Sequence, residues 1–184
     1  RKKDIEQVHI CLAFPGVEQD DEELYPISVM NNLFGGGMSS RLFQRIREEM
    51  GAAYSVYSFP STYTNCGTFT VYAGTSPETA QQVADELLGQ IRLLRDGGVT
   101  QEEFDMAKEQ LKVSYVLGLE SSSARMSAIG RSKLLRGHAV DPQDVIRKIE
   151  AVTKEDVERA AHRMFGRPFS ASAVGRNVDG LKLL

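Results

Sequence analysis

The order in which two kinds of hydrophobic periodicity follow one another constrains the fold of this chain most. Four runs alternate apolar with less apolar residues, which predicts strands, and between them apolar residues recur at spacings of three and four, which predicts helices. The strand-type runs are residues 8–14, 53–59, 68–73 and 169–174. The order β, α, α, β, β, several α, β predicts an α+β fold, with an antiparallel or mixed sheet and helices packed on one face.

Capping signals predict the ends of the first helix, over residues 22–34. Asp20 or Asp21 is expected to cap its start, and Glu23 stands in capping-box relation to Asp20. Glycines 35–37 are expected to end the helix, because glycine adopts the left-handed conformation of a C-terminal cap without steric cost. The same run could instead form a flexible loop where backbone comes close to a ligand.

Similar signals bound the helices that follow. Ser39 or Ser40 is expected to cap a second helix, which Gly51 ends. Pro77 is expected at the first position of a long amphipathic helix. Thr100 and Glu103 form a capping box for the next one, a break is expected near residues 121–123, and two shorter helices are expected to start at Asp141-Pro142 and Thr153. Residues 176–184 are expected to form a linker or tail.

Bulk properties limit the classes of function. The 184 residues fit one domain spanning 1–184, and the net charge of −3 gives no electrostatic reason to expect nucleic acid or an anionic membrane as partner. Two cysteines form no disulfide framework, which favours a reducing compartment: the cytoplasm by default, although the mitochondrial matrix would look the same. The chain begins at Arg1 without Met, which we interpret as a piece of a larger chain.

The residues expected of a metal site are absent from this sequence. The histidines, His9, His138 and His162, are far apart, and none lies in His-Glu-x-x-His or in His-x-x-Glu-His. Cys11 and Cys66 form no Cys-x-x-Cys pair. We therefore predict no metal ligands and no cofactor in this chain.

One segment carries the functional signal, LFGGGMSSRLFQRIREEMGAAYSVYS at residues 33–58. Arg47 falls at the edge of the apolar stripe of the second helix, one turn after Phe43, and Tyr54 follows just past the Gly51 break. One short turn between them lets a guanidinium fork and a phenol hydroxyl point into the same space, where both can donate to carbonyl or carboxylate oxygens. The structural alternative is that Arg47 covers the core edge and Tyr54 packs in the sheet.

This segment closely resembles the second-half signature of the insulinase, pitrilysin and mitochondrial processing peptidase family of zinc metallopeptidases. The resemblance extends to residues 65–69, 73–77 and 100–103 and weakens after about residue 137. In that family two similar α+β halves face each other around a chamber. The first half carries an inverted zinc motif and a general-base glutamate, and the second half lacks zinc.

The resemblance implies roles for particular residues. The second half supplies an Arg and a Tyr, seven positions apart, that reach the substrate near the scissile bond, and Arg47 and Tyr54 match those positions. Both are therefore the expected catalytic and substrate-binding residues, and Gly36 and Gly37 are expected to line the chamber. Zinc is expected in a homologous partner half, on the same polypeptide or on another subunit, and peptide is the expected substrate. This chain alone is not expected to cleave peptides.

Two other functions remain open at this point. A non-catalytic scaffold or core subunit would share the fold, although it would have little reason to keep both donors. A stand-alone peptide-binding module would form its pocket without a second half. A His-x-x-Glu-His motif upstream in the parent sequence would decide for the peptidase.

Overall fold

The centre of the fold is a four-stranded antiparallel sheet in the order β2-β3-β1-β4. The computed structural model describes residues 1–183. The strands are β1 (Val8–Pro15), β2 (Ala53–Thr62), β3 (Gly67–Thr75) and β4 (Ser170–Val174). In the register, Leu12 of β1 lies opposite Val71 of β3 on one side and Ala171 of β4 on the other. The antiparallel alternative of the sequence prediction is thus the one that the chain adopts.

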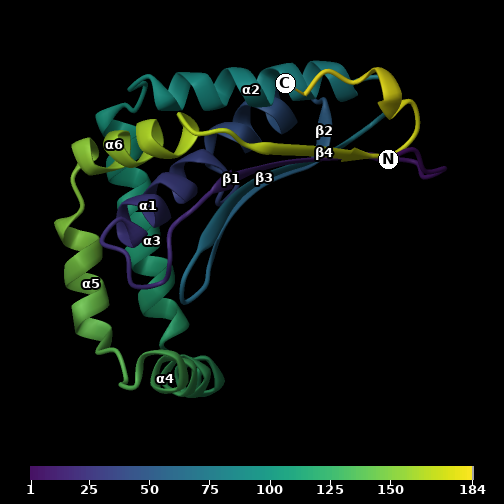
Figure 1. The fold of residues 1–184 in the computed structure, drawn as a ribbon. Helices are drawn as coiled ribbons and strands as arrows, with labels where there is room; N and C mark the ends of the chain where they lie inside the picture. The colour runs from purple at the N-terminus through teal and green to yellow at the C-terminus, as the bar shows by residue number, and fades with distance from the viewer. Residues whose placement is uncertain (184) are drawn as a thin grey trace.

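Most helices cover one face of this sheet, and α3, α4 and α5 extend past one end of it (Figure 1). α2 contacts β3, α6 contacts β1, α1 contacts β2, and α3 packs against α1. The helices are α1 (Leu24–Phe34), the π-helix η1 (Phe43–Glu49), α2 (Ala80–Arg95), α3 (Gln101–Gly118), α4 (Ser122–Arg136), α5 (Pro142–Ala151), α6 (Lys154–Phe165) and the short 3-10 helix η2 (Val178–Gly180). The α+β prediction is confirmed.

Period-two alternation separates the two faces of the sheet. In β1, Val8, Ile10, Leu12 and Phe14 are buried against the helices, and His9 and the other intervening residues are half-buried on the far face. Phe165 of α6 closes this core edge-on against Phe14 and Phe69, with ring centroids 4.9 Å and 5.7 Å away. The far face carries Tyr57, Phe59 and Tyr72, and no helix of residues 1–183 covers it (Figure 1).

Most of the predicted capping residues act as caps. Thr100 and Glu103 form the capping box of α3, and Thr153 forms one with Asp156 at α6. The Asp141 side chain accepts the backbone N–H of Gln143, with Pro142 in the first turn of α5. Ser121 caps α4 and so marks the predicted break after α3.

The helix α1 ends at Phe34 as predicted, but its start and both of its caps differ from the prediction. The N-cap is Glu23, and its side chain makes no cap bond; Asp21 instead accepts the Glu23 N–H at 2.7 Å in the preceding turn. The C-cap is Gly35, with φ −152°, so it is not left-handed. Glycine is needed there for space, because a Cβ would lie 2.5 Å from the backbone N and the Oγ of Ser58.

Two more helix starts differ from prediction. The Ser40 hydroxyl donates to the Gly37 carbonyl at 2.5 Å and caps nothing. The helix that follows takes the π hydrogen-bond pattern over η1, so the 100° per residue used for the sequence prediction does not hold there. α2 begins at Ala80, and Pro77 lies in the turn before it.

The segment after β4 does not leave the domain as a linker. Gln81 of α2 holds it by two hydrogen bonds to the backbone of Lys182, at 2.8 Å and 3.1 Å. Leu181 and Leu183 pack against the core. The last position of the predicted tail, 184, lies outside the described residues.

α3, α4 and α5 extend well beyond the sheet, and α4 lies at the far end (Figure 1). No residue of α4 is buried. Within residues 1–183, no helix is long and apolar enough to cross a membrane.

Candidate functional site

Arg47 and Tyr54 lie together, one at the end of η1 and one at the start of β2. The guanidinium carbon of Arg47 is 4.9 Å from the ring centroid of Phe43 and 5.6 Å from that of Tyr54. Both distances lie within the range of cation–π contact. Tyr54 is 71% exposed, so it does not pack in the sheet as the structural alternative required.

A β-bulge aims the Tyr54 side chain. Ala53 lies opposite Thr75 and Ser55 opposite Gly74, which leaves Tyr54 as the extra residue of β2. The Ala52 carbonyl just before the bulge accepts hydrogen bonds from the hydroxyls of Thr75 at 2.5 Å and Thr79 at 3.1 Å. Bulges redirect side chains and are common next to active sites. The bulge therefore turns Tyr54 out of the ladder towards Arg47.

η1 is fixed at several points, which sets the position of Arg47. Leu42 and Ile46 are fully buried in the core. Arg45 pairs with Glu86 of α2 at 3.0 Å, and Glu86 also accepts from Gln90. The hydrogen bond from Gln90 is the largest effect on the Glu86 carboxyl; with the Arg45 pair it outweighs burial and holds the pKa below its ordinary value.

A second ion pair fixes the segment just before η1. Arg41 donates to both carboxylate oxygens of Glu103, at 2.5 Å and 2.7 Å, and to the Gly98 carbonyl. Burial opposes ionisation of Glu103, but hydrogen bonds from Arg41 and Thr100 outweigh it and lower the pKa of the carboxyl to about 2. The pair ties the start of the helix to α3.

Arg47 lies between two hollows of the surface. One has a volume of about 460 Å³ and is lined by both Arg47 and Tyr54, together with Gln7, Thr75 and Thr79. The other, of about 260 Å³, is lined by Arg47, glycines 35–37 and residues of β2. The structure thus places Gly36 and Gly37 beside Arg47 but not in the hollow that holds Tyr54.

The donors of the pair are free. Within residues 1–183, neither the guanidinium of Arg47 nor the hydroxyl of Tyr54 has a hydrogen bond or an ion pair. Because both groups are exposed and line the same hollow, they can donate together to carbonyl or carboxylate oxygens of a ligand.

The glycine loop is packed more tightly than a flexible loop. The Ser58 backbone N–H donates to the Gly35 carbonyl at 3.0 Å, and its hydroxyl donates to Asn31 at 2.8 Å. A Cβ on Gly36 would lie 2.8 Å from the Asn32 Cα, whereas one on Gly37 would meet only the Gln110 amide at 3.6 Å. The loop therefore has room for a larger residue at Gly37 alone.

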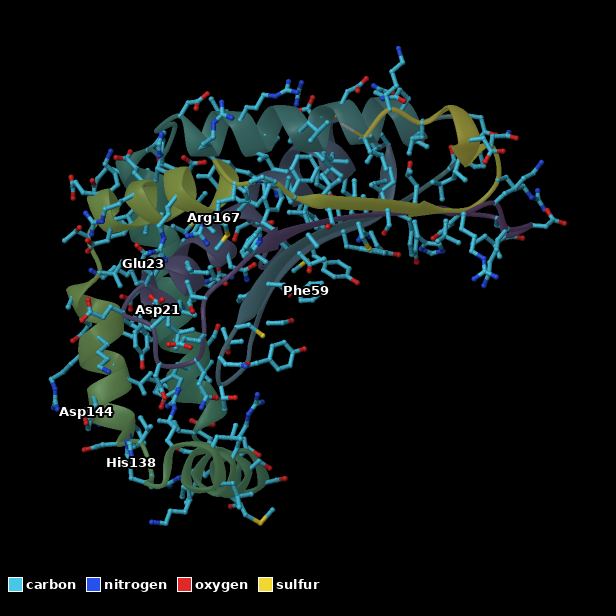
Figure 2. The ribbon with its side chains drawn as sticks, viewed as in Figure 1. Asp21, Glu23, Phe59, His138, Asp144 and Arg167 are labelled. Carbon is cyan, nitrogen blue, oxygen red and sulfur yellow. The ribbon has the colours of Figure 1, made fainter. Side chains whose placement is uncertain are left out.

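A larger hollow, of about 570 Å³, lies elsewhere, between the 20–26 segment and helices α5 and α6. Four of the five carboxylates that line it are already engaged, and one of these, Asp20, pairs with Arg136. Asp21 accepts from the Glu23 backbone, and Glu23 pairs with Arg163 (Figure 2 labels both acids). The Asp156 carboxylate accepts from Thr153 and Arg159. Unlike the hollow at Tyr54, this one is not lined by the segment that carries the family resemblance, residues 33–58.

The histidines do not come together. His9 shares a hydrogen bond with the Tyr72 hydroxyl at 2.6 Å, and His138 lies by the Arg136 carbonyl at 3.1 Å, at the far end of the molecule (Figure 2). Among residues 1–183, no group of three or more His, Cys, Asp or Glu could hold a metal ion.

The family follows from comparison with known proteins. Residues 1–111 match the family model described as the peptidase M16 inactive domain. The chain belongs to the peptidase M16 family. Within M16 it corresponds to the inactive domain, as the resemblance of residues 33–58 predicts.

Relatives across bacteria support this assignment. The chain is 40% identical over 174 residues to "Uncharacterized zinc protease YmxG" of Bacillus subtilis, and covers 42% of that protein. It is 41% identical over 174 residues to "Uncharacterized zinc protease SCO5738" of Streptomyces coelicolor, and covers 38% of it. In each comparison 95% of this M16 chain is matched. The chain spans about two fifths of the length of these relatives.

Solved structures share the M16 inactive-domain fold. The peptidase M16 inactive domain from Pseudomonas fluorescens superposes with a TM-score of 0.85 at 24% identity, over 98% of this chain and 43% of that one. A chain of complex III2 from Candida albicans gives a TM-score of 0.86 at 21% identity, over 99% of this chain and 46% of that one. At these identities the likeness concerns the fold alone.

Parts of the site were not predicted from the sequence. The bulge at Tyr54, the hydroxyls of Thr75 and Thr79, and the lining residue Gln7 come from elements far apart in the chain. Only Thr75 lies in a segment that the sequence had singled out, residues 73–77 of the family resemblance. No sequence pattern predicted the π-helix that carries Arg47.

Proposed function

We propose that this chain is the substrate-cradling, zinc-free half of a zinc metalloendopeptidase that hydrolyses peptides or small proteins. One observation carries the proposal: Arg47 and Tyr54 lie in cation–π contact, 5.6 Å apart, line one hollow and hold free donors. The family assignment and the zinc-protease names of the bacterial relatives support a peptidase context.

The complete enzyme would place a zinc-bearing homologous half opposite this one, on the same polypeptide or on a partner subunit. Zinc bound there would polarise a water for attack on the peptide carbonyl. Peptide is the expected substrate, and the relatives leave its sequence open. A cytoplasmic location, from cysteine usage, and a single domain over residues 1–184 belong to the same proposal.

This chain's own residues would hold the substrate and stabilise charge. The Arg47 guanidinium would donate hydrogen bonds to a substrate carbonyl, or bind a substrate carboxylate by two parallel N–H donors, which fixes the orientation of the substrate. The Tyr54 hydroxyl would donate to the oxygen on which negative charge develops, as in an oxyanion hole. Gly36 and Gly37 would line the neighbouring hollow, where the backbone of the substrate could pass close to Arg47.

A scaffold role is the second candidate, because a chain of complex III2 from Candida albicans shares this fold. A scaffold would not need free donors on Arg47 and Tyr54. The two functions therefore differ in what happens when those donors are removed.

The test is Tyr54→Phe in the complete protein, with peptide hydrolysis and bound zinc measured together. Loss of an oxyanion-type donor lowers turnover by roughly 10²–10³, and zinc content should not change. The matched control is Tyr63→Phe, since Tyr63 is also exposed and donates its hydroxyl to nothing among residues 1–183. Equal turnover of Tyr54→Phe and the control would remove Tyr54 from the mechanism.

A further inference from the structure

The helix α4 contributes no buried residue to the hydrophobic core. It spans fifteen residues, Ser122–Arg136, and none of them is buried. Its exposed large apolar side chains are Met126, Ile129, Leu134 and Leu135, and Leu134 is 86% exposed. An isolated helix of this length is marginal in water, because most helical stability in proteins comes from packing.

The apolar side chains do not form a single stripe. At about 100° per residue, Ile129, Leu134 and Leu135 point in directions at least about 100° apart. A surface helix keeps its apolar residues on one face, whereas a helix that is apolar on several sides is enclosed. α4 therefore has the pattern of a helix that another part of the protein covers on more than one side.

Exposed apolar side chains also occur on the second half of α3, which ends at Gly118, shortly before α4 begins at Ser122. Val113, Val116 and Leu117 are all exposed there. Together with the four apolar residues of α4 they form the arm surface: Val113, Val116, Leu117, Met126, Ile129, Leu134 and Leu135. Both helices lie at the same end of the molecule (Figure 1), and exposed apolar side chains gathered in one region mark an interaction site.

The helix α4, which carries four residues of the arm surface, is also basic. α4 carries Arg125, Arg131, Lys133 and Arg136 and no acidic residue, in a chain whose net charge is −3. Arg136 pairs with Asp20, and Lys133 donates to the Gly137 carbonyl. Arg125 and Arg131 form no ion pair within the part of the chain that the structure describes. A covering surface should therefore combine apolar side chains with carboxylates.

We infer that the arm surface is the docking site for the zinc-bearing half of the complete protein, through an apolar surface that bears carboxylates. This rests on the proposed function. The relatives are more than twice as long as the segment that this chain matches, so the covering polypeptide has the length of another half. A membrane surface fits less well, because membrane-surface helices keep their apolar residues on one side.

Hydrogen exchange of residues 122–136 tests the inference, in the 184-residue chain and in the complete protein. In the complete protein these amides should exchange at least about tenfold more slowly, because docking closes a locally open helix. Ile129→Asp should remove most of that protection. The matched control is Leu93→Asp on α2, since the two side chains are 53% and 52% exposed.

A second pair of variants tests the charge. Arg125→Glu with Arg131→Glu should reduce the protection of α4 in the complete protein, and the loss should resemble the effect of raised salt on the native protein. Arg92→Glu on α2 is the control, because Arg92 is exposed and forms no ion pair among residues 1–183.

Three results would overturn the inference. Equal exchange of α4 in the two proteins would show that nothing covers it. Protection that appears in the 184-residue chain alone and rises with its concentration would assign the surface to a second copy. Unfolding of that chain by Ile129→Asp would make α4 part of its own core. None of these readouts depends on peptide hydrolysis, so an inactive complete protein would refute the proposed function and leave this test intact.

Discussion

At the scale of single residues, Arg47 differs from the other arginines of its own segment, because it forms no ion pair among residues 1–183. The other arginines near η1, Arg41 and Arg45, pair with Glu103 and Glu86. The Arg47 guanidinium lies over the rings of Phe43 and Tyr54. A guanidinium held by two ring faces keeps its N–H groups free for a ligand, which a structural ion pair would not allow.

Arg47→Ala should raise the KM of the complete protein for peptide by about tenfold, because a lost bidentate contact of this size is worth about 1.4 kcal/mol. The melting temperature should stay nearly unchanged, since an exposed cation–π contact contributes only about 0.5–1 kcal/mol. Arg47→Lys keeps the charge but not the fork and should show most of the same defect. A collapse of the melting temperature would instead mark Arg47 as a support of the core edge.

Gly35→Ala should destabilise the fold by about 1–3 kcal/mol, the usual cost of forcing a methyl group into packed structure. The added Cβ would lie 2.5 Å from the backbone N of Ser58, which cannot move without disturbing β2. Urea denaturation measures the change. Gly118→Ala is the control, because nothing lies within 4 Å of a Cβ there; a similar loss of stability in both variants would contradict the packing argument.

At the scale of elements, the position of η1 depends on links to two other helices. Arg45 reaches Glu86 of α2, and Arg41 reaches Glu103, which also closes the capping box of α3. Glu103 therefore stabilises the start of one helix and the start of another at once. A substitution of Glu103 should therefore also change the position of Arg47, although the two residues are not in contact.

Glu103→Gln should lower the free energy of unfolding by about 1.5–3 kcal/mol, the range for hydrogen bonds to charged groups. Glu102→Gln is the control, because Glu102 is exposed in the same turn and accepts no side-chain bond from Arg41. Urea denaturation of both variants near neutral pH gives the comparison. Equal stability of the two variants would show that the Arg41–Glu103 pair does not stabilise the fold.

The same carboxyl gives a pH dependence. Its pKa in the folded chain is about 2, below the ordinary value of 4.5. The ionised form is thus favoured by folding, so its stabilisation is complete above pH 4.5 and is lost as the pH falls towards 2. The stability difference between the native chain and Glu103→Gln should shrink over that interval. A difference that is constant down to the lowest pH would contradict the sign.

At the scale of the whole molecule, the chain has one hydrophobic core and two surfaces that it leaves uncovered. One is the sheet face with Tyr57, Phe59 and Tyr72, and the other is the arm surface on α3 and α4. A chain that spans about two fifths of its relatives leaves room for a polypeptide that covers such surfaces.

The 184-residue chain alone should hydrolyse no peptide and bind no zinc stoichiometrically, whereas the complete protein should do both. The reason is that residues 1–183 contain no group of ligands for a metal ion. Peptidase assays with metal analysis of both proteins provide the measurement. Zinc-dependent cleavage by the chain alone would refute the division of labour, and an inactive complete protein that holds no zinc would favour a scaffold.

The sequence by itself determined most of the elements and the juxtaposition of Arg47 and Tyr54. Period-two and period-3.6 patterns, with the caps at Thr100, Ser121 and Thr153, predict strands and helices close to the observed ones, because these signals are local in the chain. The seven-residue spacing of Arg47 and Tyr54 across one turn was also enough to expect them side by side.

Tertiary structure decided what depends on contact between distant segments. Gly35 is a glycine because Ser58 of β2 lies against it, and not because of a left-handed cap. The π-helix and the bulge at Tyr54 form where η1 and β2 must fit α2, α3 and β3 at once, and no local propensity encodes that fit. The exposed α4 likewise has an ordinary helical sequence, and only the fold shows that this chain leaves it uncovered.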